Sequence, residues 1–219
     1  MTECRVFVGG HSFVASIEDH LRHQFGRTQG PATWGDYVTG ELKVSSFVEQ
    51  IHFVGKRGAK VTQDYMLPAQ LLNRIKFHIG ILDLGSNDVV LRAVTPERIA
   101  EHILSEAEAM RDLFGIPVVK ICSIVNRENA GQLTAEEFTA KAFRVNELLK
   151  EACKHQAGLS YHGHEGFWKN SHGASVDCNA YSYDGIHANS PAGRKKYKAS
   201  LTKAIHSARR ELRAQGYKV

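Results

Sequence analysis

Residues 75–88, IKFHIGILDLGSND, join an apolar run to a short polar loop. The run predicts a strand from 75 to 84, and because it is apolar on both faces toward its end, we expect that end to be buried on both sides. Such strands are typical of a parallel sheet that helices cover on both faces. This stretch therefore predicts an α/β protein with functional residues in the loop that follows the strand.

Further strands follow from the same kind of pattern. Apolar runs predict strands at residues 5–10, 47–54 and 117–125, and a short strand is expected within 158–167. Helical spacing of apolar residues follows the first strand, from 13 to about 25. Strands that alternate with helices in this way, rather than pairing as hairpins, indicate βαβ units and a parallel sheet.

Three later helices have clear N-terminal signals. Thr95 is a capping residue with Pro96 at the first helical position. Residues 134–137, TAEE, form a capping box. Ser190, followed by Pro191, is expected to cap the last helix. These signals predict where the helices of the second half of the chain begin.

Length and composition are typical of one globular domain. The chain has 219 residues, of which 42% are hydrophobic and 23% are charged. We expect a single domain over residues 1–219, either complete or excised from a larger protein. No apolar run approaches the ~20 residues that cross a bilayer. The first residues lack the basic and then apolar layout of a secretory signal, so an intracellular location is expected.

The four cysteines lie far apart and form no CxxC pair. A chain of this length needs no disulfide framework, and the spacing predicts no zinc site. We therefore expect reduced thiols at Cys4, Cys122, Cys153 and Cys178.

Positive charge is concentrated at the C-terminal end of the chain. Residues 190–219 contain nine Lys or Arg and one acid, a charge of +8, so the remaining chain carries −3 of the total of +5. A basic segment on a mildly acidic body can contact the phosphates of nucleic acid or of lipid head groups. The alternative is that these charges form an ordinary solvated helix face. The charge count taken alone favours this alternative over a binding role.

The first predicted strand ends in a glycine-rich loop, Gly9-Gly10-His11-Ser12. Ser12 would lie at the edge of the sheet, at the N-terminus of the following helix. A serine in that place can act as a nucleophile while its backbone N–H helps to bind an oxyanion. Taken alone, the pattern also fits an ordinary helix N-cap.

Two further loops offer groups that can stabilise negative charge. Residues 55–59, GKRGA, follow the second predicted strand, and glycine lets a backbone N–H approach a ligand closely. Asn87 follows the central run and can point its side-chain NH₂ at developing negative charge, while Asp88 would fix the turn. Each loop by itself also fits a plain turn.

Near the C-terminal end, Asp184 precedes His187 across a glycine turn. A carboxylate at this spacing can bond one ring nitrogen of the histidine, fix its tautomer and stabilise the imidazolium ion. The other ring nitrogen then faces away and can take a proton from a serine. The alternative is a solvent-exposed pair in a loop.

Taken in order, these loops resemble the sequence blocks of the SGNH (GDSL-like) hydrolase superfamily. The resemblance extends from residue 6 to about residue 201, and Ser12, Gly58, Asn87 and His187 match the four blocks.

The specific matches are residues 85–88, GSND, and residues 184–187, DGIH. His11 departs from the pattern, because an Asp usually precedes the serine, and this leaves the hydrogen bonds of that loop open. Gly55 is an alternative to Gly58 in the second block.

The resemblance implies a flavodoxin-like three-layer α/β/α sandwich with a central parallel five-stranded sheet. It also implies hydrolysis of carboxylic esters, of short acyl or acetyl type, through an acyl-serine intermediate and without a cofactor or metal. Ser12 would be the nucleophile, His187 the general base and then acid, and Asp184 the residue that orients His187. The N–H groups of Ser12 and Gly58 and the side chain of Asn87 would form the oxyanion hole.

The C-terminal end is similar to a narrower branch, the esterase domains in the first open reading frame of some animal non-LTR retrotransposons. The similarity rests on Gly193, Tyr197 and Leu201, with residues 166–168, GFW, before them. It implies a module of a larger nucleic-acid-associated protein that acts on short acyl esters or membrane lipids. The basic last helix would then contact nucleic acid or an anionic membrane.

Two other functions stay open on the sequence. The first is an SGNH-fold pseudo-enzyme that binds RNA, as in germ-plasm proteins of insects, and the basic last helix favours it. The second is a metal hydrolase built on His155, His162, His164 and His172 with Glu165 nearby, because His-x-His can chelate a metal. The full set of catalytic residue types favours the esterase over both.

Overall fold

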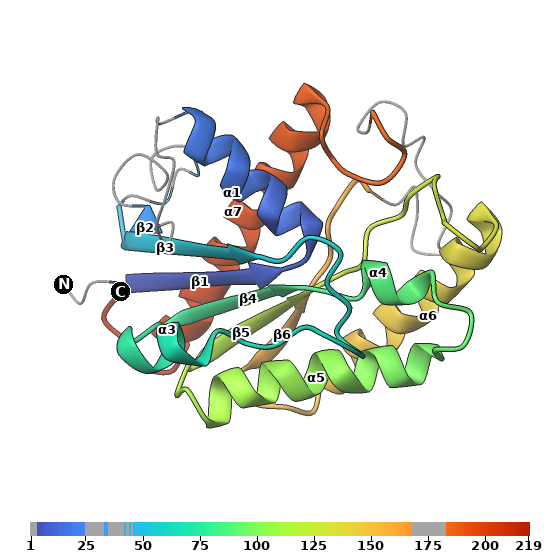
Figure 1. Cartoon of the computed structure of the whole chain (residues 1–219). Coiled ribbons are helices and arrows are strands. Elements are labelled where there is room, and N and C mark those ends of the chain that lie inside the picture. The colour runs from blue at the N-terminus through green and yellow to red at the C-terminus, as the bar shows by residue number, and fades with distance from the viewer. Residues whose placement is uncertain (1–3, 25–32, 35–41, 43, 45, 168–182) are drawn as a thin grey trace.

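The computed structural model describes residues 4–24, 33–34, 42, 44, 46–167 and 183–219, which form a six-stranded sheet in the order β2-β3-β1-β4-β5-β6 (Figure 1). The strands are β1 (Cys4–Gly10), β2 (Thr33–Trp34), β3 (Val48–Gly55), β4 (Ile79–Asp83), β5 (Val118–Cys122) and β6 (Leu159–His162). All neighbours pair in parallel except the two-residue β2, which pairs antiparallel with β3 at one edge. The expected parallel five-stranded sheet is confirmed, and β2 is an addition that the sequence did not predict.

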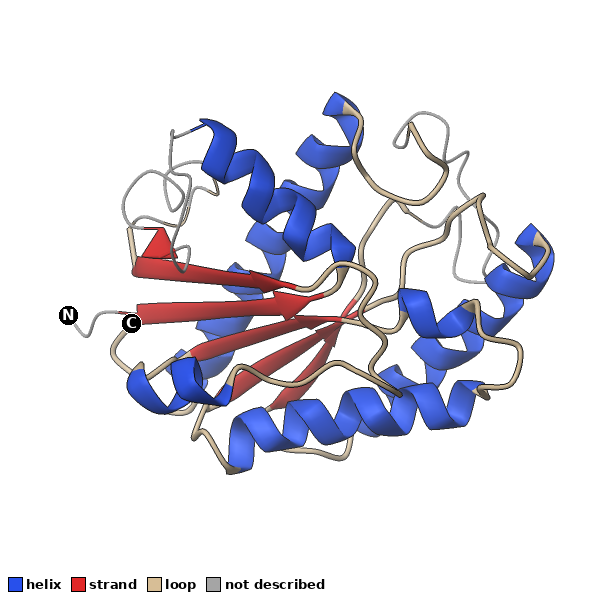
Figure 2. Cartoon of the chain, viewed as in Figure 1, coloured by secondary structure: helices blue, strands red, loops and turns tan. Residues whose placement is uncertain are grey.

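Helices cover both faces of this sheet, so the domain has three layers (Figures 1 and 2). The described helices are α1 (Ser12–Gln24), α3 (Ala69–Arg74), α4 (Ser86–Val89), α5 (Pro96–Asp112), α6 (Ala135–Cys153) and α7 (Pro191–Ala214). Helices α1 and α7 pack on one face, and α5 and α6 pack on the other. The expected three-layer α/β/α architecture is confirmed.

Alternation of side chains along the strands builds two hydrophobic cores. On β1, Val6 and Val8 belong to the core under α1 and α7, whereas Phe7 belongs to the core under α5 and α6. The same division separates Ile81 from Leu82 on β4. All five side chains are fully buried. Because both faces are covered, the central strand has no polar alternation, which is why its sequence is continuously apolar.

The predicted helix starts are confirmed. Thr95 Oγ1 accepts the N–H of Arg98 at 3.2 Å, and Ser190 caps α7 in the same way. Thr134 and Glu137 form the complete capping box at the start of α6. Each cap satisfies an N–H group that the first helical turn leaves without a partner, and such caps stabilise a helix by about 1 kcal/mol.

The central run differs from its prediction in its first half. Strand β4 begins at Ile79 rather than at residue 75, because residues 69–74 form α3 and Ile75 is the C-cap of that helix. A helix of six residues is shorter than two turns and shows no apolar period that a sequence can reveal. The strand ends at Asp83, a buried carboxyl group in an otherwise apolar run.

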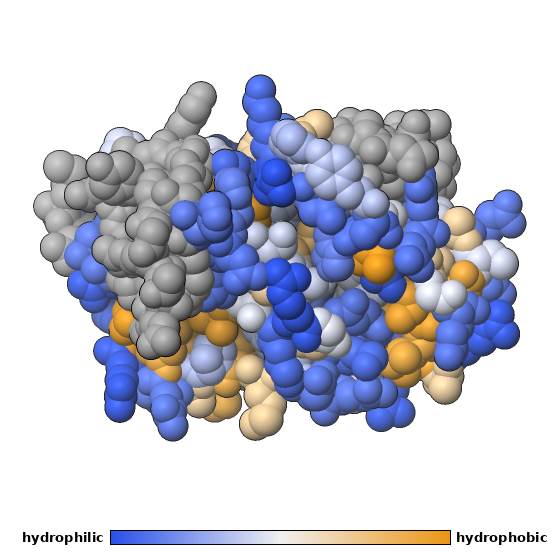
Figure 3. Space-filling view, turned by 45° about the horizontal axis from the view of Figure 1, so that its top comes forward, coloured by the Kyte–Doolittle hydropathy of each residue, from blue (hydrophilic) through white to orange (hydrophobic). Residues whose placement is uncertain are grey.

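The face of the molecule in Figure 3 is mainly hydrophilic, with apolar residues in separate patches. Among the described residues, the large apolar side chains that are exposed lie far apart in the sequence, at Met66, Leu113, Tyr183 and Tyr217. None of the described helices combines the length and the apolar character that a membrane span requires. Apolar side chains are thus concentrated in the two cores.

Candidate active site

The carboxyl ends of three neighbouring strands meet at one edge of the sheet (Figure 1). Gly10 at the end of β1 lies opposite Gly55 of β3 on one side and Asp83 of β4 on the other. The loops that leave these strands therefore start side by side, and they carry the predicted serine, glycine and asparagine. This edge is where open α/β sheets generally place their functional loops.

Ser12 is the first residue of α1 and follows the end of β1 after a tight turn. The N–H of His11 donates to Asp83 O at 3.2 Å, and the N–H of Ala15 donates to His11 O at 3.1 Å. Gly10 is required in this turn, because a Cβ atom would lie 2.5 Å from Asp83 O. Ser12 is 4% exposed. Its hydroxyl is thus buried at a helix N-terminus, where the first N–H groups favour negative charge.

Side chains of the β4–α4 loop hold the loop that follows β3. Asn87 Nδ2 donates to Ala59 O at 3.1 Å. The buried carboxylate of Asp88 accepts the N–H groups of Val61 (3.0 Å) and Thr62 (2.9 Å) and the Thr62 hydroxyl (2.7 Å). Asp88 therefore fixes both loops, and it holds Asn87 beside the glycine loop.

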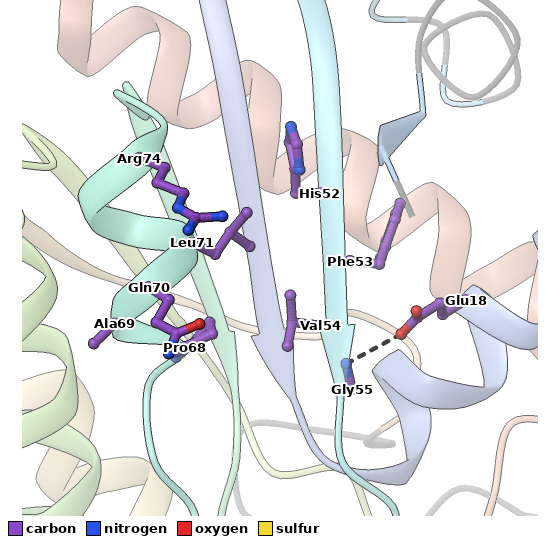
Figure 4. A pocket seen from close by; sticks show the side chains of 10 residues that line it. All are labelled: Glu18, His52, Phe53, Val54, Gly55, Pro68, Ala69, Gln70, Leu71 and Arg74. Atoms are coloured by element: carbon purple, nitrogen blue, oxygen red, sulfur yellow. Dashed lines mark hydrogen bonds between the residues drawn. The ribbon is translucent and has the colours of Figure 1, made fainter. Parts of the chain in front are cut away.

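The two candidate glycines of this loop have different environments. At Gly55, a Cβ atom would lie 2.1 Å from Ala15 N of α1, and the Gly55 N–H donates to Glu18 Oε2 at 3.3 Å (Figure 4). Gly58 has a φ of +71° and no atom within 4 Å of where a Cβ would stand. Gly55 is thus explained by packing against α1, and its N–H is already used, whereas Gly58 lies at an exposed turn.

A pocket of about 580 Å³ lies between the end of β3 and α3 (Figure 4). Val54 and Leu71 are among its apolar walls, and Arg74 and Glu18 are its charged residues. Of the candidate oxyanion residues, its lining includes Gly55, the alternative to Gly58, whereas Ser12, Asn87, Asp184 and His187 are not among its lining residues. The serine and the Asp–His pair therefore lie outside this pocket.

Asp184 and His187 form the expected carboxylate–imidazole pair. Asp184 Oδ2 lies 2.6 Å from His187 Nδ1, and Oδ1 accepts the N–H groups of Ile186 (2.9 Å) and His187 (2.8 Å). A carboxylate only accepts hydrogen bonds, so Nδ1 carries a hydrogen, and in the neutral ring Nε2 keeps its lone pair. His187 is therefore in the tautomer that a general base requires.

The turn that carries this pair is anchored to the loop after β5. Gly185 has a φ of +69°, and its carbonyl accepts the N–H groups of Glu128 and Asn129, both at 2.9 Å. Asn189 Nδ2 adds a hydrogen bond to Asp184 Oδ2 at 3.0 Å. The turn thus holds the carboxylate firmly while the pair remains open to solvent.

The ring of His187 lies near the residue that follows Ser12. The ring of His187 lies 5.7 Å, between centroids, from the ring of Phe13, the residue after Ser12. Ser12 Oγ instead lies 3.3 Å from His11 Nδ1, and the described residues include no hydrogen bond between Ser12 and His187. In enzymes without substrate such catalytic bonds are often long and tighten on binding. The structure therefore places the acid–histidine pair beside the residue that follows Ser12, without a described hydrogen bond to the serine.

A buried carboxylate beside this loop was missed by the sequence analysis. Asp83, 4% exposed, lies 3.5 Å from the Nε2 atoms of both His11 and His164, and it accepts the hydroxyl of Tyr197. Burial raises the pKa of Asp83, but hydrogen bonding to the two histidines outweighs burial and holds that pKa well below its ordinary value. The one signal in the sequence was the aspartate itself within an apolar strand.

Part of the histidine-rich stretch serves hydrogen bonding in the core. His162 Nε2 and His164 Nδ1 both contact Ser200 Oγ, at 2.9 and 2.8 Å. Burial lowers the pKa of His162 to about 4, so this ring is neutral at neutral pH. These two side chains are explained by packing between β6 and α7.

The other members of the proposed metal cluster lie apart from that pair. His155 is exposed and contacts Glu151, and Glu165 pairs with Lys203. His172 lies outside the described residues. Within the described ranges, no three His, Cys, Asp or Glu side chains are grouped as metal ligands. The metal interpretation therefore finds no support in this part of the chain.

The described cysteines are free thiols with raised pKa values. Burial raises the pKa of Cys4 to about 12 and that of Cys153 to about 11, and it raises the pKa of Cys122 well above its ordinary value. Such thiols are poor nucleophiles at neutral pH. Cys178 lies outside the described residues. The expectation of reduced thiols is met at the three described positions.

Many basic side chains of residues 190–219 have contacts within the protein. Those with hydrogen bonds, ion pairs or aromatic contacts include Arg194, Lys196, Lys203, Arg209 and Arg213. The exposed basic residues of this segment are Lys195, Lys203, Arg210, Arg213 and Lys218. Part of the basic charge of this segment is therefore engaged within the protein, and part faces solvent.

The sheet, the serine at a helix N-terminus and the Asp–His pair define an α/β protein with a candidate serine-hydrolase site. No protein-family model matches the chain, and no curated protein matches its sequence. Solved structures match over nearly the whole chain, at 14–16% identity. One is a mutant acetyl-xylooligosaccharide esterase from Geobacillus, with a TM-score of 0.65 and 14% identity over 92% of this chain and 93% of that chain. A second is a carbohydrate esterase family 3 protein from Talaromyces cellulolyticus, with a TM-score of 0.60 and 15% identity over 94% of this chain and 98% of that chain. A third is a GDSL-like lipase from Bacteroides thetaiotaomicron, with a TM-score of 0.56 and 16% identity over 93% of this chain and 88% of that chain. The chain has the three-layer fold of GDSL-like (SGNH) hydrolases.

Proposed function

We propose that the protein is a serine esterase that hydrolyses carboxylic esters through an acyl-serine intermediate on Ser12. The observation that carries the proposal is the Asp184–His187 pair, whose tautomer leaves Nε2 free close to the loop of Ser12. The fold shared with several esterases and a GDSL-like lipase supports the same chemistry. Fold alone does not define a reaction, so the residues of the site carry the argument.

In the proposed reaction, His187 is first a base and then an acid. His187 Nε2 takes the proton of Ser12 as Oγ attacks the acyl carbon, and it gives that proton to the leaving alcohol. In the second half, the same nitrogen activates a water molecule that releases the acid from Ser12. Asp184 fixes the tautomer and stabilises the imidazolium ion in both halves.

The proposed oxyanion hole has three donors. Asn87 has two N–H donors on its side chain and uses one for Ala59 O, so a second remains for an oxyanion. The N–H groups of Ser12, at the start of α1, and of Gly58, at the exposed turn, complete the set. Such donors stabilise charge that develops only during the reaction, and losing one costs roughly 3–4 kcal/mol of barrier.

We propose that the acid part of the ester is short, of acetyl size. Ser12 is almost fully buried, with the rings of Phe13 and His187 nearby, and this favours a small acyl group over a bulky one. Two of the structural matches are an acetyl esterase and an acetyl-xylooligosaccharide esterase, which supports the same size.

We further propose that the chain is a module related to the retrotransposon esterases and contacts nucleic acid through α7. The run of Gly193, Tyr197 and Leu201 that carries this resemblance is buried along one side of α7. Exposed Lys195 and Arg210 are the side chains that would meet phosphate. A Lys195→Glu/Arg210→Glu variant should bind single-stranded RNA more weakly and with a smaller dependence on salt. Equal binding by both proteins would contradict this proposal.

Turnover of p-nitrophenyl acetate tests the esterase directly. Wild type should release p-nitrophenol, and Ser12→Ala should lose activity by about 10⁴-fold or more. Ser207→Ala, which removes a serine of α7 that contacts Lys120, is a matched control and should keep full activity. Equal rates for wild type and Ser12→Ala would show that Ser12 is not the nucleophile. The RNA-binding pseudo-enzyme would then be the better interpretation.

A further inference from the structure

Two imidazole groups lie near Ser12, and one of them is outside the proposed triad. His11 Nδ1 lies 3.3 Å from Ser12 Oγ, and His11 Nε2 lies 3.5 Å from Asp83 Oδ1. We propose that His11, oriented by Asp83, is a second proton acceptor for Ser12. This inference rests on the proposed function, in which Ser12 is the nucleophile.

The neighbours of His11 determine which ring nitrogen holds the hydrogen. The backbone N–H of Phe13 points at His11 Nδ1 at 3.5 Å, and an N–H group can only donate. Nδ1 must therefore present its lone pair, so the hydrogen of the neutral ring is on Nε2, facing the Asp83 carboxylate. With that tautomer, the Ser12 hydroxyl can donate to the same Nδ1 lone pair, which it shares with the longer contact from the Phe13 N–H. A basic nitrogen thus lies within reach of the serine proton.

The charge of Asp83 is held in place from three sides. Its Oδ1 faces His11, and its Oδ2 accepts the hydroxyl of Tyr197 and faces His164 Nε2. These neighbours keep the pKa of Asp83 low in spite of burial, so the group stays a carboxylate. A buried carboxylate behind an imidazole stabilises the imidazolium ion that forms when the ring takes a proton. Asp83 would serve His11 as Asp184 serves His187.

Hydrogen bonds beyond Asp83 fit the same orientation. If His164 Nε2 carries the hydrogen that faces Asp83, its Nδ1 must accept, and the Ser200 hydroxyl donates to it at 2.8 Å. Ser200 Oγ then accepts the Nε2–H of His162 at 2.9 Å. Donors and acceptors thus alternate from His162 to Ser12, and the longest steps are the 3.5 Å contacts of Asp83 with His164 Nε2 and His11 Nε2. This alternation favours one arrangement of the hydrogens.

Burial separates the role of His11 from that of His187. His11 is 1% exposed, so it can receive the serine proton but cannot reach a leaving group. In acylation through His11, the Ser12 proton moves to Nδ1, Oγ bonds to the acyl carbon, and the bond from that carbon to the leaving oxygen breaks. When water later attacks the acyl carbon, it gives up one proton to solvent, and Oγ leaves and takes its own proton back from Nδ1. An alkoxide leaving group needs a proton that the buried His11 cannot deliver, whereas p-nitrophenolate leaves as an anion.

The test is the first turnover of p-nitrophenyl acetate in a His187→Ala enzyme. We expect a burst of p-nitrophenol stoichiometric with enzyme, because His11 still takes the serine proton, and no detectable cleavage of ethyl acetate. Adding His11→Asn should slow the burst by about 10²-fold, the lower end of what a positioned base contributes. Asparagine keeps a hydrogen-bond acceptor near the place of Nδ1 without its basicity. A role in positioning alone would leave the burst rate unchanged.

His78→Asn is the matched control in the same background. His78 is also buried, and its Nδ1 accepts a backbone N–H, from Arg5 at 3.2 Å, but it precedes β4 at the opposite edge of the sheet. This control should leave the burst unchanged. If His11→Asn does not fold, Asp83→Asn in the His187→Ala enzyme decides the same question, because it removes the charge behind His11.

The outcomes separate the two proposals. A burst rate that His11→Asn leaves unchanged, or a His187→Ala enzyme without any burst, overturns the role of His11 and leaves the esterase intact. A Ser12→Ala enzyme with a wild-type burst overturns the proposed function itself.

Discussion

Two aspartate–histidine pairs lie near one serine, and their surroundings are opposite. Asp184 and His187 are three residues apart on a turn, with side chains 41% and 23% exposed and a contact of 2.6 Å. Asp83 and His11 come from different strand ends, with side chains 5% and 2% exposed and a contact of 3.5 Å. The first pair depends on local chain geometry, whereas the second depends on how β1 and β4 align.

This difference shows how burial divides roles between groups of the same chemistry. An exposed pair can pass protons to an alcohol or take them from water. A buried pair can only exchange a proton with the group that it touches, here Ser12, and its charge is part of the core. We therefore expect substitutions in the exposed pair to change the reaction, and substitutions in the buried pair to change stability as well.

Asp184→Asn should have the largest effect. The asparagine amide can donate to His187 Nδ1 and favour the wrong tautomer, so kcat for an alkyl acetate should fall by about 10⁴-fold. The midpoint of thermal unfolding should change little, since the turn keeps its shape. Steady-state kinetics by pH-stat and a thermal melt check both parts. A fall of less than tenfold would mean that His187 is not oriented by Asp184.

Asp83→Ala should have the next largest effect, and it should lower stability as well as turnover. Removing the carboxylate leaves the polar groups of His11, His164 and Tyr197 buried without their shared partner. The free energy of unfolding should fall by about 3–5 kcal/mol, the range for breaking a buried charged cluster. Urea unfolding measures it. Asp184→Ala is the control and should cost about 1 kcal/mol, because its side chain is 41% exposed and its partners can bond water instead.

Asn87→Ala sharpens the comparison on the exposed side of the site. Loss of one oxyanion donor should lower kcat by about 10²–10³-fold while KM changes little, because the donor acts on charge that develops in the transition state. Asn129→Ala is a matched control. Asn129 bonds the Gly185 carbonyl through its backbone N–H, so alanine keeps that bond. It should keep kcat within about twofold. Equal losses in the two variants would remove Asn87 from the proposed oxyanion hole.

The two pairs also explain how much the sequence could predict. Asp184 and His187 were found because three residues across a glycine turn fix their geometry without the rest of the fold. The pairing of His11 with Asp83 could not be found, because it needs the register of β4 against β1 and the tautomer of a buried ring. His11 was noticed only as a departure from a family pattern.

In the fold, elements were predicted where the sequence pattern is long enough to show a period. The parallel sheet was predicted because its central strand is apolar on both faces, and the long helices were predicted from caps and apolar stripes. The two-residue β2 and the six-residue α3 were missed, because neither is long enough for a period of 2 or 3.6 residues to show. The start of β4 was misplaced for the same reason.

The smallest effect is expected at His162, the far end of the buried chain from Ser12. Burial lowers the pKa of His162 from its ordinary 6.5 to about 4, so below pH 6.5 the unfolded chain takes up a proton that the folded chain refuses. The stability that the neutral His162 ring contributes is therefore fully present above pH 6.5 and is lost as the pH falls toward 4. His162→Asn should lose about 1 kcal/mol less stability than wild type over that interval, after allowance for partial exposure. Urea unfolding at pH 6.5 and pH 4 measures the difference, and the contribution of Asp83 cancels because both proteins contain it. Identical losses in both proteins would show that His162 is protonated in the folded state, and the proton order inferred from His162 to Ser12 would have to be revised.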